Sequence, residues 1–153
     1  MVDNELRSLE IRDFEDGDFA SLARLWTESG VASPSRGDSL ESVRATLAAR
    51  GRILVMGGDG KRSSGGDRGV IASVWLTDDG RRLFVHHMAV LPEWQGKGLG
   101  KRLMVAAVGI AAERGLQMKL EVARDNEGAI ALYRRFGFEG LGDYEVMIRR
   151  RIG

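Results

Sequence analysis

The order of apolar and polar residues divides the chain into short strands and amphipathic helices. Period-two alternation and short apolar runs predict six strands. They lie at 9–14, 52–56, 69–76, 81–90, 117–123 and 144–150. Apolar residues three or four positions apart predict four helices, which lie within 15–30, 38–51, 99–115 and 125–137. The order is a strand, two helices, three strands, and then helix, strand, helix and strand.

Capping residues and glycines mark several boundaries of these elements. Asp38 or Ser39 fits the cap of the second helix, and Gly51 fits its end. Asp125 or Asn126 fits the cap of the last helix. A DDG sequence between the third and fourth strands is typical of a hairpin turn. The pattern therefore predicts a mixed α/β fold of the α+β type, with an antiparallel meander followed by a crossover helix.

Length and composition narrow the class of protein. The chain has 153 residues and is 43% hydrophobic, which suits one domain over residues 1–153 with a sizeable core. The net charge of +1 argues against a nucleic-acid partner. With no cysteine, disulfides and thiolate metal sites are excluded. The polar start and the lack of a long apolar run predict no membrane association and a cytoplasmic location.

The segment PEWQGKGLGKRL (92–103) places glycines at every second position between a strand and a helix. A P-loop is excluded because Gln95 and Arg102 stand where it needs glycine and Ser or Thr. A dinucleotide fingerprint is excluded because Lys101 stands where it needs its third glycine. A helix N-terminus with Lys97, Lys101 and Arg102 still favours a phosphate. The alternative is a glycine-rich turn with surface lysines.

Three motifs, in their order and spacing, resemble the GNAT superfamily of acyl-CoA-dependent N-acyltransferases. QGKGLG (95–100) fits Q/R-x-x-G-x-G/A, MAVLP precedes it, and NEGAIALY with a following GF fits N-x-x-A-x-x-x-Y. The element order matches too, so the resemblance covers the whole chain. It implies a mostly antiparallel central sheet with splayed middle strands and about four flanking helices. It also implies acetyl-CoA as cosubstrate, with free coenzyme A as product and no metal.

The resemblance also implies the contacts with coenzyme A. Backbone N–H groups of the loop hold the pyrophosphate, and the preceding strand end pairs with the pantetheine arm. That strand diverges from the strand ending near Ala123, and the acyl chain lies in the gap. Asn126 matches the residue that bonds the pantetheine arm, a role compatible with a helix cap. The implied cofactor-binding residues are Met88, Ala89, Val90, Gln95, Gly96, Lys97, Gly98, Leu99, Gly100, Lys101 and Asn126.

Three residues are candidates for the catalytic groups. Tyr133 matches a tyrosine that protonates the leaving thiolate; the alternative is a core aromatic. His86 resembles a strand histidine of serotonin N-acetyltransferase, and Glu121 resembles the base of the ribosomal-protein alanine acetyltransferases. Water can take the proton instead. By the period of two, His86 shares a face with Met88 and Val90, and His87 points to the other face and is structural.

The acceptor is predicted to be a primary amine of a small molecule or peptide. The short sequence after Gly137 lacks an aromatic pair associated with peptide acceptors, which weakens a protein N-terminus as substrate. Contacts with the acceptor are predicted in and near the segment that links the first two helices. For most of these residues, the alternative is a solvated loop. They are Trp26, Ser33, Ser35, Arg36 and Asp38. The alternative functions are a non-catalytic acyl-CoA sensor and an N-terminal protein acetyltransferase; a homodimer would use the last strand as its edge.

Overall fold

The structure is a computed structural model that describes residues 2–32, 37–57 and 69–150. The chain divides into two compact units, Met1–Glu121 and Val122–Gly153. The first unit contains the whole sheet and four of the five α-helices of the described chain. The prediction of one domain over the full length therefore stays a prediction.

Two features named from the sequence lie outside the described ranges. Residues 58–68 contain most of the glycine-rich segment between the second and third predicted strands. Residues 33–36 contain three of the predicted acceptor contacts, Ser33, Ser35 and Arg36. The predictions made for these residues stay predictions.

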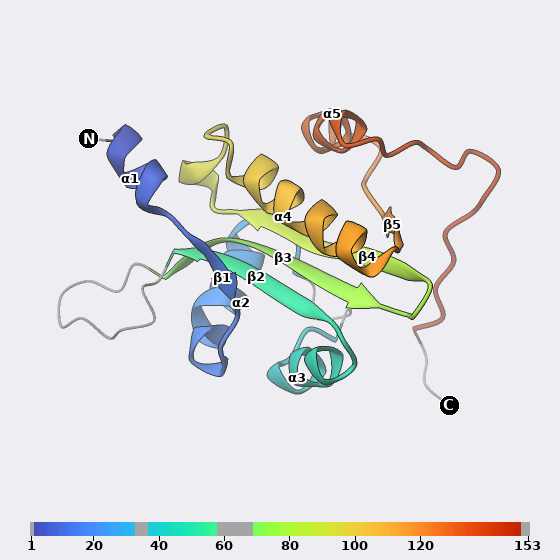
Figure 1. The fold of residues 1–153 in the computed structure, drawn as a ribbon, viewed down its shortest axis with the longest axis horizontal. Helices are drawn as coiled ribbons and strands as arrows, with labels where there is room; N and C mark the ends of the chain where they lie inside the picture. The colour runs from blue at the N-terminus through green and yellow to red at the C-terminus, as the bar shows by residue number, and fades with distance from the viewer. Residues whose placement is uncertain (1, 33–36, 58–68, 151–153) are drawn as a thin grey trace. The chain divides into compact units, whose positions relative to one another are not determined.

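A five-stranded sheet in the order β1-β2-β3-β4-β5 forms the centre of the first unit (Figure 1). Neighbouring strands from β1 to β4 are antiparallel, and β5 is parallel to β4. The strands are β1 (Ile11–Asp13), β2 (Arg52–Gly57), β3 (Val70–Asp78), β4 (Arg82–Val90) and β5 (Gln117–Leu120). The predicted mixed and mostly antiparallel sheet is confirmed.

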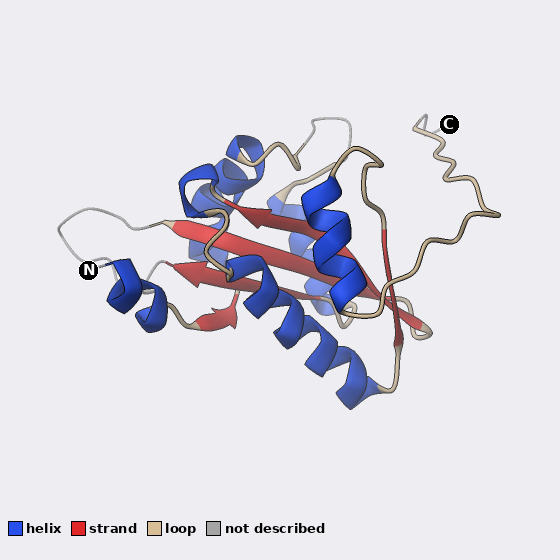
Figure 2. Ribbon diagram, turned by 90° about the horizontal axis from the view of Figure 1, so that it is seen from above, coloured by secondary structure: helices blue, strands red, loops and turns tan. Residues whose placement is uncertain are grey.

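Helices cover both faces of this sheet. In Figures 1 and 2, α4 lies on one face, and α2 and α3 lie on the other. The α-helices are α1 (Val2–Ser8), α2 (Phe19–Glu28), α3 (Leu40–Ala48), α4 (Leu99–Arg114) and, in the second unit, α5 (Glu127–Arg135). Two short 3-10 helices are η1 (Asp16–Asp18) and η3 (Pro92–Trp94). The crossover predicted between the two parallel strands is α4, because it connects β4 to β5.

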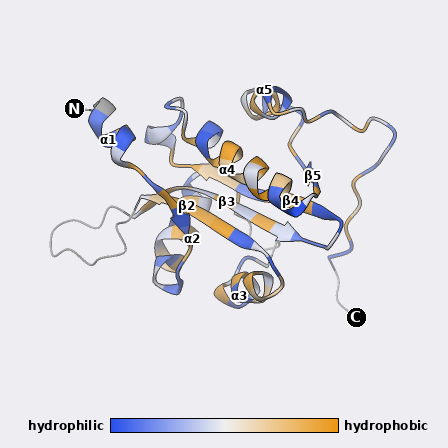
Figure 3. Cartoon of the chain, in the orientation of Figure 1, coloured by the Kyte–Doolittle hydropathy of each residue, from blue (hydrophilic) through white to orange (hydrophobic). Residues whose placement is uncertain are grey.

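Alternate residues of the central strands face the two helical layers. Trp75 of β3 stacks on Trp26 of α2, with ring centroids 5.3 Å apart and 2° between the planes. Leu54 of β2 instead lies beside Ala106 and Ile110 of α4. Figure 3 shows β2 coloured mainly as hydrophobic, whereas α4 mixes hydrophobic and hydrophilic positions. The strands are thus buried between two layers, and α4 has one face in solvent.

The end of α3 differs from the prediction made for Gly51. Arg50 takes the left-handed conformation there, with φ of 71°. Gly51 is required for a different reason: a Cβ at this position would lie 2.6 Å from the Thr46 carbonyl oxygen and 2.9 Å from that of Leu76. The glycine therefore permits the close approach of α3 to β3.

The last predicted strand, 144–150, is wrong, because these residues have no regular structure. Its apolar side chains are exposed, with Tyr144 at 77% and Met147 at 89% of full exposure. A strand needs a neighbour for its backbone N–H and C=O groups, and α5 is the only regular element in residues 122–150. The homodimer predicted to pair through this segment stays a prediction. The strand predicted over 117–123 also ends early, at Leu120.

The N-terminal helix α1 was not predicted, and Arg102 holds it to the first turn of α4. The guanidinium donates through Nη1 to the carbonyl of Leu6 at 3.0 Å. Through Nη2 it donates to the carbonyl of Leu9, in the link to β1. Arg102 was expected to add positive charge to the glycine-rich loop, but its hydrogen-bonding groups point to the N-terminal segment.

We expect Arg102→Ala to lower the free energy of unfolding by about 1–3 kcal/mol, because two carbonyls lose a charged hydrogen-bond donor. Urea denaturation followed by circular dichroism measures the change. Lys101→Ala is the matched control, since it removes an exposed cation from the same helical turn. Equal stability of the Arg102 variant and the wild type would contradict a structural role for these bonds.

Candidate functional site

The loop between η3 and α4 is shaped by two glycines in the left-handed region. Gly96 has φ of 74° and Gly98 has φ of 83°. Residues with side chains rarely adopt this conformation, so glycine is favoured at both positions. A Cβ at either glycine would contact no atom within 4 Å. The surface of the loop is therefore open to a ligand.

The backbone of this loop presents a row of unpaired donors. Between Gly96 and Lys101, no backbone N–H donates to an acceptor within the described ranges, and Gly98 provides no side-chain cap. Pairing begins with the N–H of Arg102, which donates to the Gly98 carbonyl at 3.1 Å. Consecutive free N–H groups at the N-terminus of a sixteen-residue helix suit an anion such as a phosphate. The predicted residues Gly96, Lys97, Gly98, Leu99, Gly100 and Lys101 all lie in this row.

The cations near the loop differ from one another in their contacts. The Lys97 ammonium donates to the carbonyl of Glu93 at 2.8 Å and lies 4.9 Å from the centre of the Trp94 ring. These contacts hold the side chain against η3. The Lys101 side chain is exposed, and no contact of its ammonium is found among the described residues. Lys101 is therefore the loop cation that is available to a bound anion.

The end of β4 extends beyond its partner β5. Pairing between the two strands ends at Val85 and Leu120, whereas β4 continues to Val90. The predicted pantetheine-binding residues, Met88, Ala89 and Val90, all lie in this extension. Gln95 donates through Nε2 to the Val90 carbonyl at 3.0 Å and so ties the strand end to the loop. On the β5 side, the end of β4 is open to an added extended chain.

A β-bulge in β4 changes which residues share a face. Ser73 pairs with Ala89, and Trp75 pairs with His86, so two steps along β3 match three steps along β4. His87 has φ of 41°, in the left-handed region. Paired residues share a face, so Ala89 lies on the face of Ser73 and Trp75. The prediction that His86 shares a face with Met88 and Val90 is therefore wrong.

Both histidine rings lie against Trp75, although opposite faces were predicted for them. The His86 ring centroid is 6.3 Å from that of Trp75, and the His87 centroid is 5.6 Å from it. His87 also packs edge-on to Trp26, at 4.9 Å. The cause is the extra residue of the bulge, which turns two consecutive side chains toward α2. The sequence around His86 and His87 contains no pattern that would have predicted this bulge.

His86 is held by a hydroxyl and an aromatic ring. Its Nε2 lies 2.7 Å from the Thr77 Oγ1, and its ring stacks on Phe84 at 5.9 Å. Desolvation by these surroundings lowers the pKa of His86 from 6.5, and the neighbouring His87 lowers it further. The charges of Glu121 and Asp38 act in the opposite direction. A neutral ring at pH 7 follows, and neutral imidazole can accept a proton.

His87 is paired with Asp38, which lies between α2 and α3. The His87 Nε2 is 2.8 Å from the Asp38 Oδ2, and the two side chains are 11% and 12% exposed. Ser39 caps α3, since its Oγ accepts from the N–H of Ser42 at 3.1 Å. The sequence left Asp38 and Ser39 as alternative caps. Because Ser39 takes that role, the carboxylate of Asp38 is available to the histidine.

Trp26 is too deeply buried to contact the amine that is predicted to accept the acetyl group. The side chain is 1% exposed, and its Nε1 donates to the Ser73 Oγ at 3.1 Å. The prediction of Trp26 as an acceptor contact is therefore not supported by its position. Glu121, by contrast, follows the end of β5 and is exposed. Its side chain has no hydrogen bond or ion pair within the described ranges.

The second unit contains the other two predicted site residues. Asn126 caps α5, because its Oδ1 accepts from the N–H of Ala129 at 3.2 Å. Tyr133 of the same helix is buried, and its ring lies 5.9 Å from that of Phe138. Burial raises the pKa of Tyr133 above 10.0. The phenol therefore carries its proton at neutral pH.

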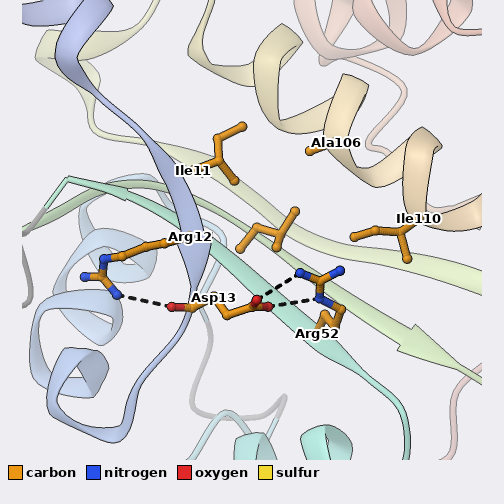
Figure 4. A pocket seen from close by; sticks show the side chains of 7 residues that line it. Ile11, Arg12, Asp13, Arg52, Ala106 and Ile110 are labelled. Carbon is orange, nitrogen blue, oxygen red and sulfur yellow. Dashed lines mark hydrogen bonds and ion pairs between the residues drawn. The ribbon is translucent and has the colours of Figure 1, made fainter.

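A shallow cavity of about 300 Å³ lies elsewhere in the first unit, between β1, β2 and α4 (Figure 4). Its charged residues are already paired. Arg52 binds Asp13 at 2.9 Å, and Arg12 binds Asp18 at 2.7 Å. The cavity thus offers no unpaired charge to a ligand and lies on the α4 face, away from the histidines.

The described residues contain neither a helix that could span a membrane nor a cluster that could bind a metal. No helix among them is long and apolar enough to cross a membrane. No group of three or more histidine, aspartate or glutamate side chains among them could hold a metal ion.

Comparisons with known proteins relate the chain to acetyltransferases. N-alpha-acetyltransferase RimI of Mycobacterium tuberculosis is 43% identical over 67 residues, which cover 44% of this chain and 38% of RimI. Mycothiol acetyltransferase of Clavibacter sepedonicus is 42% identical over 65 residues, which cover 42% of this chain and 21% of that protein. The matches thus span well under two-thirds of these relatives.

A solved structure with the same fold contains coenzyme A. The PaiA N-acetyltransferase of Thermoplasma acidophilum, crystallised with coenzyme A, has a TM-score of 0.69 and 21% identity. The match covers 86% of this chain and 90% of that one. Finally, the model of the acetyltransferase (GNAT) family matches residues 10–138. With the open loop, the extended β4 and the mixed sheet in place, this match shows that the chain belongs to the acetyltransferase (GNAT) family.

Proposed function

We propose that the chain transfers an acetyl group from acetyl-CoA to a primary amine of a small molecule or peptide, by direct attack in a ternary complex. The observation that carries the proposal is the row of unpaired N–H groups from Gly96 to Lys101. Acetyl-CoA is the acyl donor of the family. Its pyrophosphate has the charge and size that such a helix N-terminus binds. We place this reaction in the cytoplasm.

The end of β4 supports the same donor. Residues Met88 to Val90 extend past β5, so a pantetheine arm can add to β4 as an extended chain. Its two amides would then use backbone groups that β5 leaves free. A backbone N–H near Val90 would stabilise the oxyanion that forms when the amine attacks the thioester carbonyl. Asn126 is proposed to bond the pantetheine arm, with its Oδ1 already engaged as a cap.

The reaction needs an acid and a base. Tyr133 is proposed as the acid that protonates the departing thiolate, because its buried phenol stays protonated at neutral pH. His86 and Glu121, named from the sequence, are candidates for removing the amine proton, either directly or through water. In support, desolvation lowers the pKa of His86 and so favours the neutral ring at pH 7, and the Glu121 side chain is exposed.

The chemical class of the amine that accepts the acetyl group is proposed from the relatives. RimI, by its name, acts on N-terminal amines, and this supports including peptides among the acceptors. Mycothiol acetyltransferase supports including small molecules. Thiol release from acetyl-CoA should therefore be followed with amino acids, polyamines, amino sugars and peptides bearing free N-termini. Binding of coenzyme A with no release on any of these acceptors would favour the alternative of a non-catalytic sensor.

The loop assignment is tested with two substitutions of equal size. Asparagine and aspartate both tolerate the left-handed region better than other residues, and the space at Gly98 is open. We expect Gly98→Asn to weaken coenzyme A binding by less than about tenfold. Gly98→Asp should weaken it by a further factor of about ten or more, because a carboxylate then faces the pyrophosphate.

Isothermal titration calorimetry with coenzyme A measures both dissociation constants, at two salt concentrations. The difference between the two variants should shrink at higher salt, because screening weakens repulsion between exposed charges. Equal affinities of the aspartate and asparagine variants in folded protein would show that no phosphate lies at this loop.

Tyr133→Phe tests the proposed acid without removing the ring from its buried place. We expect kcat to fall by about a hundredfold, the size typical of one acid–base group. The dissociation constant of acetyl-CoA should change by less than about threefold. Because burial raises the pKa of Tyr133, the loss of rate that comes from deprotonation of this group should begin at a higher pH than it would for a free tyrosine. A normal kcat in the phenylalanine variant would assign the proton to water or another group.

A further inference from the structure

The pair of Asp38 and His87 stands apart from the residues that the family resemblance assigns. Asp38 comes from the link between α2 and α3, and His87 from the bulge in β4. Their side chains meet at 2.8 Å and are nearly buried, with exposed fractions of 12% and 11%. A buried aspartate bonded to a histidine is costly to maintain unless the two groups satisfy each other.

The surroundings fix the ring of His87 in one position. Trp26 and Trp75 meet it edge-on, at centroid distances of 4.9 and 5.6 Å, each with 71° between the planes. The backbone at His87 is in the left-handed region, which costs energy for any residue with a side chain. The bulge and the two indoles therefore hold the imidazole where it faces Asp38.

Hydrogen-bond chemistry assigns the proton within this pair. A carboxylate offers only acceptors, so the hydrogen between the two groups belongs to the His87 Nε2. In the neutral ring, the lone pair then lies on Nδ1. Nδ1 has no partner among the described residues, and no buried polar side-chain atom among them lacks a partner. It follows that Nδ1 reaches the surface.

We propose that His87, oriented by Asp38, is the base that takes the proton from the acceptor amine. This inference rests on the proposed acetyl transfer. The acceptor ammonium first passes one proton to the His87 Nδ1, directly or through one water. The free amine nitrogen then forms a bond to the thioester carbonyl carbon and loses its second excess proton to solvent. The carbon–sulfur bond breaks, and the thiolate takes a proton from Tyr133. His87 then releases its proton to solvent, and Tyr133 regains one from solvent.

Position along β4 supports this role. His87 immediately precedes Met88, the first residue of the segment proposed to hold the pantetheine arm. Its ring lies on the face covered by α2 and α3, and Asp38 comes from the link between those helices. An amine approaching from this face would meet the histidine beside the strand that holds the donor.

His87 is better oriented than the two bases named from the sequence. His86 has a hydroxyl partner, Thr77, and no carboxylate bonded to its ring. Glu121 has no partner in the described chain that would fix its direction. A base held by a third group is the arrangement that activates nucleophiles in many enzymes. The pair with Asp38 is the one that provides it.

Among the described residues, few charged groups surround His87. On β4 itself the neighbouring titratable group is His86, and from the link between helices it is Asp38. Glu121, after β5, acts on His86 through its charge. The residues that α2 and β3 pack here, Trp26 and Trp75, are uncharged. Within the described ranges, the carboxylate of Asp38 is therefore the charged group that bonds the ring.

The test compares three variants with the best acceptor found for the wild type. His87→Gln should lower kcat/KM at pH 7 by about a hundredfold, since one acid–base group is lost. Asp38→Asn should lower it by about tenfold and shift the acidic limb of the pH profile, because the ring loses its charged partner. His86→Gln, at the adjacent histidine that is the competing candidate for the base, should lower kcat/KM by much less than His87→Gln. Affinity for coenzyme A should stay within about twofold in all three.

Two further measurements separate catalysis from folding. The loss of kcat/KM in His87→Gln should become smaller as the pH rises, because the acceptor amine is then already unprotonated. A loss caused by a structural defect would instead be the same at every pH. In the wild type, long-range proton–nitrogen NMR spectra should show the His87 ring protonated on Nε2. A neutral ring protonated on Nδ1 would overturn the proposal, because the base would have no lone pair there.

The outcomes distinguish this inference from the proposed function. An active wild type with normal kcat/KM and a normal pH profile in His87→Gln would overturn the role of His87 and leave acetyl transfer intact. A larger loss in His86→Gln than in His87→Gln would also overturn it. A wild type that binds coenzyme A and releases no thiol with any acceptor would refute acetyl transfer and this inference together.

Discussion

The stack of Trp26 on Trp75 is the interaction on which the acceptor face of the sheet depends. Two large rings 5.3 Å apart join α2 to the centre of β3. Each buried indole must also place its N–H, and each does so on a hydroxyl: Trp26 on Ser73 at 3.1 Å and Trp75 on Thr46 of α3 at 3.0 Å. The same stack therefore fixes α2 and α3 on the sheet. It also positions the ring of Trp75, against which both histidines pack. Loss of Trp75 would remove the ring against which both histidines pack.

The bulge in β4 is the second constraint, and the sequence alone does not reveal it. Period two places His86 and His87 on opposite faces, and this rule holds only while each residue of β4 opposes one of β3. The register shifts between Ser73 and Trp75, and the extra residue brings both rings to Trp75. The shift belongs to the pairing of two strands, so no pattern within one of them predicts it. For the same reason Asp38 was read as a helix cap or an acceptor contact, and its pairing with His87 was missed.

The sequence predicted the loop well because its determinants are local. Glycines that need positive φ, a helix start and unpaired N–H groups are all set by a few neighbouring residues, and Gly96 and Gly98 fit that expectation. The cations were predicted less well, since a long flexible side chain goes to whichever acceptor the fold provides. Lys97 is held by the Glu93 carbonyl, and Arg102 by carbonyls before β1. The alternation in 144–150 failed likewise, because a strand depends on a neighbour that residues 122–150 do not contain.

These constraints bear on why a histidine occupies the strained position in the bulge. Glycine would relieve the left-handed backbone at residue 87, and asparagine would cost less than histidine. The structure instead places an imidazole there, closes two indoles around it and sets a carboxylate 2.8 Å from its Nε2. Packing alone needs neither the strain nor the buried charge, since an apolar ring would fill the same space without Asp38. The cost is understandable if the second ring nitrogen, which points out of the pair, is what the arrangement serves.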